Sequence, residues 1–122
     1  MAADGLTSDE AAALDRALRA LDADEAPARP DLERACRALT RLIAARVPGR
    51  SVELRVPPFA AVQIIEGQRH RRGTPPATVE ISPTDWLRLA TGRISWDAAI
   101  DDGIIRASGV RSDLSPYLPL LA

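Results

Sequence analysis

The sequence contains no lysine, one cysteine, one histidine and only 3% aromatic residues. A single cysteine cannot form an internal disulfide, and one histidine with one cysteine gives no metal-ligand set. No apolar run approaches the roughly 20 residues of a transmembrane helix. The acidic start MAADGLTSDE lacks the basic and apolar segments of a signal peptide. We therefore expect a cytoplasmic protein with no metal, no cofactor and no stable membrane insertion.

The 122 residues are enough for one domain, and 46% of them are apolar. The formal net charge is −1, which argues against a general nucleic-acid or membrane-surface binder. Charge is nevertheless uneven, because residues 1–33 carry nine acids and three arginines, whereas residues 34–72 carry nine arginines and two acids. Solvated helix faces and one basic loop account for this distribution.

Helical periodicity marks two long segments. Thr7 and Glu10 have the spacing of a capping box and open a helix predicted over 7–23. DADEAPARP follows as a linker, with two prolines as breakers. The second helix, 32–47, has a single apolar stripe and ends at Pro48-Gly49.

The apolar period then changes from 3.6 to 2, which predicts strands at 52–56, 59–66 and 77–82. Ser82 and Ser95 are the expected N-caps of two short helices, ended by Gly92 and Gly103. A last strand at 104–108 precedes an apolar tail. The order ααβββααβ predicts an α+β fold, a small and mostly antiparallel sheet covered by helices.

Four segments of the chain resemble the sterol carrier protein type-2 superfamily, in particular its small stand-alone actinobacterial branch. The last of the short helices leads into GIIRASG, residues 103–109, which fits the G-x-I/V-x-x-x-G pattern of that family. The segments that carry the resemblance are PGRSVELRVPPFAAVQ, RHRRGTPPATVE, DWLRLATGRISWDAAIDDGIIRASG and RSDLSPYLPLL. The similarity covers about residues 30–122, so residues 1–29 are expected to be an N-terminal helical extension and linker.

The resemblance implies a sheet of about five strands and an apolar tunnel between sheet and helices. In better-known relatives such a tunnel takes sterols, fatty acids or acyl-CoA. Both tryptophans, Trp86 and Trp96, either pack in an ordinary core or line that tunnel. The residues expected to line it are Leu39, Ile43, Val62, Ile64, Val79, Trp86, Leu89, Trp96, Ile100 and Leu118.

Arginines are the usual means of holding a phosphate or carboxylate, so Arg55, Arg69 and Arg72 are the candidates for an anionic head group. No catalytic residue is predicted. His70 stands among arginines without a nucleophile beside it. Cys36 falls on the apolar stripe of its helix, where a free cysteine acts as a small hydrophobe.

The leading hypothesis is a non-enzymatic domain that binds a lipid, a fatty acid or an acyl-CoA-like ligand. A second hypothesis is an interaction module of the same fold with a filled tunnel, in which the apolar tail 114–121 pairs with a partner or forms a homodimer. A third is an accessory subunit of a thiol-dependent enzyme. The apolar tail has three alternatives of its own: it covers the core, a ligand or another subunit.

Overall fold

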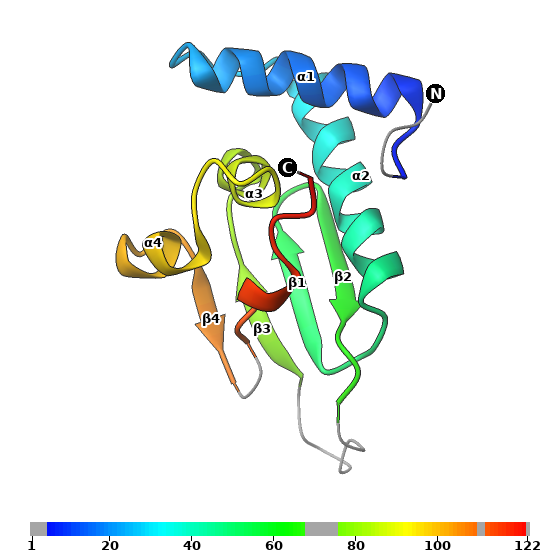
Figure 1. The fold of residues 1–122 in the computed structure, drawn as a ribbon, viewed down its shortest axis with the longest axis vertical. Coiled ribbons are helices and arrows are strands. Elements are labelled where there is room, and N and C mark those ends of the chain that lie inside the picture. The colour runs from blue at the N-terminus through cyan, green and yellow to red at the C-terminus, as the bar shows by residue number, and fades with distance from the viewer. Residues whose placement is uncertain (1–4, 68–75, 110–111, 122) are drawn as a thin grey trace.

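The structure is a computed structural model that describes residues 5–67, 76–109 and 112–121. Four helices, four strands and one 3-10 turn follow each other in these residues in the predicted order (Figure 1). Their bounds are α1 Ser8–Asp22, α2 Arg29–Arg46, β1 Val52–Val56, β2 Ala60–Ile64, β3 Ala77–Glu80, α3 Pro83–Ala90, α4 Trp96–Asp101, β4 Arg106–Ser108 and the 3-10 turn Ser115–Tyr117.

The strands form one sheet in the order β2-β1-β3-β4. β1 pairs antiparallel with β2 and parallel with β3, and β3 pairs antiparallel with β4. The α+β fold with a mostly antiparallel sheet is therefore confirmed. The prediction of about five strands was one too high for the described residues, because the resemblance implied a fifth strand that the apolar pattern does not contain.

One face of the sheet is buried and the other is polar. In β1, Val52, Leu54 and Val56 are fully buried, while Glu53 and Arg55 point to the opposite face. The buried strand residues share one core with the helices and with the C-terminal segment, which crosses the sheet in Figure 1. The molecule thus has two layers, and the core lies between them.

The predicted helix caps are present, which explains where three helices begin. Thr7 and Glu10 form a full capping box: the Thr7 N–H donates to Glu10 Oε1 at 2.8 Å, and the Glu10 N–H donates to Thr7 Oγ1 at 3.1 Å. Ser82 accepts from the Asp85 N–H, and Ser95 accepts from the Ala98 N–H.

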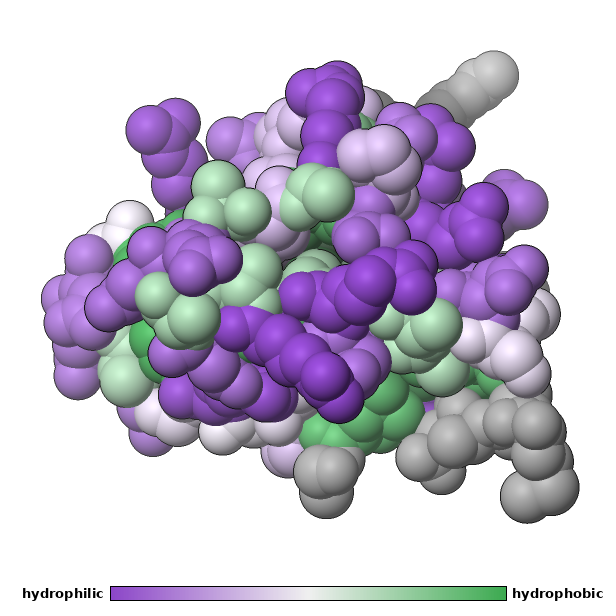
Figure 2. Space-filling model, turned by 90° about the horizontal axis from the view of Figure 1, so that it is seen from above, coloured by the Kyte–Doolittle hydropathy of each residue, from purple (hydrophilic) through white to green (hydrophobic). Residues whose placement is uncertain are grey.

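The N-terminal helix α1 lies across the top of α2 and α3 (Figure 1). Its inward face is apolar, with Leu14, Ala17 and Leu21 buried. Seen from the α1 side, the surface is mostly hydrophilic, with hydrophobic residues in small separate patches (Figure 2). Among the described residues, none of the helices has both the length and the apolar character to cross a membrane.

The C-terminal segment covers the core, which is one of the three predicted alternatives. Leu114 is fully buried and Leu120 is nearly so. The N–H groups of Leu120 and Leu121 both donate to the carbonyl of Ala90, at 2.8 and 3.1 Å. Arg46 Nη1 donates to the Leu120 carbonyl at 2.7 Å. These bonds fix the tail against the ends of α3 and α2.

Candidate ligand-binding site

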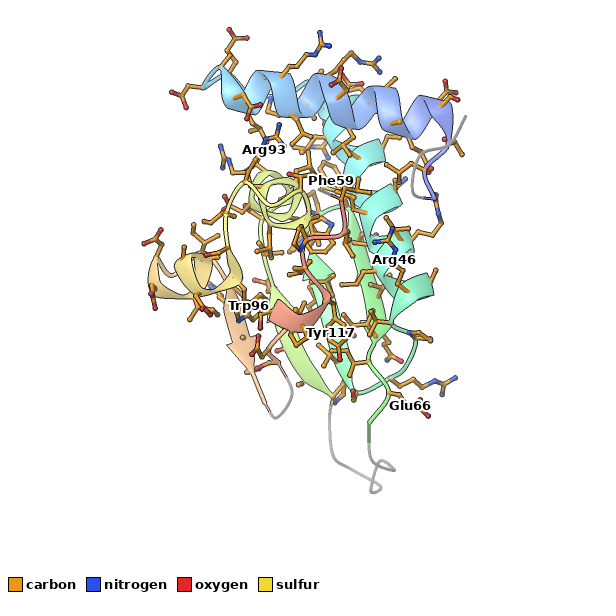
Figure 3. The ribbon with its side chains drawn as sticks, viewed as in Figure 1. Arg46, Phe59, Glu66, Arg93, Trp96 and Tyr117 are labelled. Atoms are coloured by element: carbon orange, nitrogen blue, oxygen red, sulfur yellow. The ribbon has the colours of Figure 1, made fainter. Side chains whose placement is uncertain are left out.

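A pocket of about 200 Å³ lies where the end of α3, the α3–α4 connection and the start of α4 meet the C-terminal segment. Trp96 lies between α4 and the 3-10 turn that carries Tyr117 (Figure 3). Its lining combines apolar side chains with hydroxyl and carboxylate groups. The pocket is lined by Leu89, Gly92, Ile94, Ser95, Trp96, Asp97, Ser115, Leu118 and Pro119.

The pocket forms because the chain turns sharply after α3. Gly92 has a φ of +78°, a left-handed conformation that residues with a Cβ adopt rarely. A Cβ at this glycine would approach Pro119 to 3.5 Å, so the tail passes close to the turn. Ser95 then caps α4 and directs Trp96 back toward the helix–sheet core. Trp96 is only 8% exposed although it lines the pocket.

Three predicted lining residues, Leu89, Trp96 and Leu118, come together in this pocket from three different elements. Trp86, one helical turn before Leu89, is buried in the core. Ile100 is 40% exposed on α4. Of the remaining predicted residues, Leu39, Ile43, Ile64 and Val79 are fully buried in the core, and Val62 is partly buried against it.

Trp86 has an unusual polar group. Its side chain is fully buried. Its indole Nε1 is also buried and has no hydrogen-bond partner among the described residues. A buried donor without an acceptor costs about 1–3 kcal/mol. The core formed by the described residues therefore holds one unsatisfied donor.

The predicted anionic head-group residues do not gather at this pocket. Arg55 lies on the polar face of β1, where it forms an ion pair with Glu53. It borders a separate, open hollow of about 490 Å³ beside Pro57, Phe59 and Glu80. Arg69 and Arg72, like His70, lie outside the described residues, so their relation to either hollow stays a prediction.

Cys36 is a buried thiol with little capacity for chemistry. Desolvation raises its pKa to about 12, so the thiol stays protonated at neutral pH. Its Sγ donates weakly to the Pro83 carbonyl at 3.5 Å. In the part of the chain that the structure describes, no three His, Cys, Asp or Glu side chains are grouped so that they could hold a metal ion.

Sequence reasoning missed the polar part of the pocket. Ser95 was identified only as a helix cap, and Asp97 and Ser115 were not singled out. The cap pattern placed Ser95 correctly, but nothing local indicated that the tail would return to the end of α3. The contact that brings it there, from Leu120 to Ala90, spans the whole of α4 and β4.

In a comparison with protein families, the family described as "Bacterial SCP ortholog" matches residues 28–120. The matched segment begins just before α2 and includes the whole sheet, both short helices and almost all of the tail. It excludes α1. A comparison with curated proteins found no match.

Proposed function

The chain belongs to the family of bacterial SCP orthologs, and from this premise we propose that it is a non-enzymatic domain that binds a small apolar or amphipathic ligand. The site is the pocket between α3, α4 and the C-terminal segment. The observation that carries the proposal is the convergence of Leu89, Trp96 and Leu118 on this pocket. A lipid, a fatty acid or the acyl part of an acyl-CoA-like molecule fits this chemistry. We place this binding in the cytoplasm of a bacterium.

The size of the pocket limits what can enter without movement. Sites for drug-sized ligands usually have about 300–1,000 Å³, and this pocket has about 200 Å³. It therefore takes one short apolar group as it stands. A longer chain requires the tail or the α3–α4 connection to shift, which exposes the core between α3 and the sheet.

The lack of catalysis is part of the same proposal. Cys36, the single cysteine, is held protonated by burial. The pocket lining offers the hydroxyls of Ser95 and Ser115 and the carboxylate of Asp97, and among the described residues Asp97 forms no hydrogen bond with either hydroxyl that would activate it. Binding without chemistry is the function that these groups support.

Two measurements test the binding. Native mass spectrometry and lipid extraction of the purified protein report a ligand carried through purification. Displacement of a fluorescent fatty acid by unlabelled palmitate reports affinity. Carriage predicts a co-purified apolar molecule or a saturable displacement curve, whereas the absence of both would contradict the proposal.

A pair of variants locates the site. Leu118 and Leu121 are both partly buried leucines of the tail, but only Leu118 lines the pocket. Leu118→Ala should weaken probe binding about tenfold, since about 1.4 kcal/mol of apolar contact is lost. Leu121→Ala is the matched control and should leave the affinity within about twofold. Equal effects of both variants would place the site elsewhere.

A further inference from the structure

Helix α1 lies outside the matched family segment, yet one of its side chains reaches the connection that forms a pocket wall. Asp22 is the last residue of α1, and Arg93 lies in the α3–α4 connection between the lining residues Gly92 and Ile94. Arg93 Nε donates to Asp22 Oδ1 and Arg93 Nη2 donates to Asp22 Oδ2, both at 2.9 Å. The pair is bidentate, the strongest geometry for an arginine and a carboxylate.

The position of Asp22 indicates that this pair has a tertiary role. A carboxylate at the C-terminal end of a helix is unfavourable beside the helix dipole, where basic residues are preferred. The Arg93 guanidinium offsets this and lowers the pKa of Asp22 below its ordinary value. Arg93 points from the α3–α4 connection toward α1 (Figure 3).

The same arginine is tied into the turn that shapes the wall. Its N–H donates to the Arg88 carbonyl at 2.8 Å, and its Nη1 donates to Thr91 Oγ1 at 3.2 Å. Thr91 Oγ1 in turn donates to the Leu87 carbonyl at 2.7 Å. The orientation of the connection is thus linked on one side to α3 and on the other side to α1.

Helix α1 itself is firmly held. Arg16 binds Asp31 at the start of α2 through two bonds of 2.9 and 3.1 Å, and Arg41 of α2 forms an ion pair with Glu10. With the buried Leu14 and Leu21 these contacts fix α1 on the domain. An anchored helix that binds a connection through one bidentate pair can restrain the movement of that connection.

We propose that the Asp22–Arg93 pair makes α1 a restraint on the ligand pocket, so that Asp22 and Arg93 are positioning residues that limit the size of the ligand admitted. This inference rests on the proposed function. Breaking the pair frees the connection that carries Gly92, Ile94 and Ser95, and the pocket then opens to longer chains.

The test compares Asp22→Asn with Asp15→Asn in the full chain. Asp15 pairs with Arg19 within α1 at 3.0 Å, and both side chains are well exposed, so its loss should not reach the pocket. Saturated fatty acids from octanoate to stearate are the probes. Asp22→Asn should raise the affinity for the longest acids about threefold to fivefold, the effect expected from the loss of one exposed ion pair. Asp15→Asn should leave this affinity unchanged.

Hydrogen exchange over residues 91–96 gives a readout that needs no ligand. Asp22→Asn should accelerate exchange in this segment by a similar factor, and the reversed pair Asp22→Arg with Arg93→Asp should restore the wild-type rate. If the exchange rate of residues 91–96 is the same in Asp22→Asn as in Asp15→Asn, the proposed restraint is refuted. If wild-type protein binds none of the acids while exchange responds as expected, the proposed function fails and the coupling of α1 to the connection stands.

Discussion

The unsatisfied indole of Trp86 allows a prediction in which two opposing contributions can be separated. Trp86→Phe keeps an aromatic ring in the core but removes the Nε1 donor, which has no acceptor among the described residues. The smaller ring leaves roughly 40 Å³ unfilled, which costs about 1 kcal/mol at about 24 cal/mol per Å³. Removal of the orphaned donor returns about 1–3 kcal/mol. The net change in the free energy of unfolding should therefore lie between zero and about 2 kcal/mol of stabilisation.

Two further variants isolate the contributions. Trp86→Ala removes the whole side chain from a fully buried position and should destabilise the protein by about 3–5 kcal/mol. Trp96→Phe makes the same ring change at a residue that borders the pocket, where the indole is not an orphaned donor, so only the loss of packing should appear, at about 1 kcal/mol.

Urea unfolding followed by far-UV circular dichroism measures all three variants against the wild type. A loss of more than about 1 kcal/mol for Trp86→Phe, which exceeds the packing cost alone, would refute the reasoning. Such a loss would mean that the indole N–H is bonded in solution, to a buried water or to a retained ligand. Lipid extraction of the wild-type sample distinguishes these two partners.

The other predictions concern two titratable groups. The hydrogen bond from Arg41 lowers the pKa of Glu10 to about 2, so the stabilisation from this pair is present above pH 4.5 and is lost as the pH falls toward 2. Glu10→Gln should cost about 1 kcal/mol at pH 7 and nothing near pH 2 in urea titrations; a difference that stays constant with pH would contradict this assignment. For Cys36, burial should slow the reaction with Ellman's reagent at pH 8 on the order of a hundredfold relative to the urea-unfolded chain, and rapid labelling of the native protein would show that the thiol is accessible.

Local patterns predicted the elements well because local bonds determine where these elements begin. The capping box at Thr7 and the caps at Ser82 and Ser95 use atoms within three residues of each other. Strand alternation likewise identified the buried side of β1. The observed bounds differ from the predicted ones at the strand ends, where β4 is limited to Arg106–Ser108, and at the start of α2, which begins at Arg29 instead of residue 32.

Contacts between distant residues were beyond such reasoning. The parallel pairing of β1 with β3 depends on how the chain returns after β2, and strand alternation is the same in either direction. The Asp22–Arg93 pair joins residues 71 positions apart. The pocket was predicted only in part, because Leu89 and Trp96 lie on neighbouring helices while Ser115 and Pro119 belong to a tail whose path the sequence left open.

The two N–H groups that donate to the Ala90 carbonyl affect the order in which the protein folds during its synthesis. The last residue of α3 receives its hydrogen-bond donors from Leu120 and Leu121. During translation these donors are made well after the helix they serve, so the end of α3 is unfinished while the intervening chain emerges. The synthesis of α3 and the formation of the hydrogen bonds at its end are therefore separated in time. A nascent chain stalled before Leu120 would expose a frayed end of α3 to chaperones and proteases.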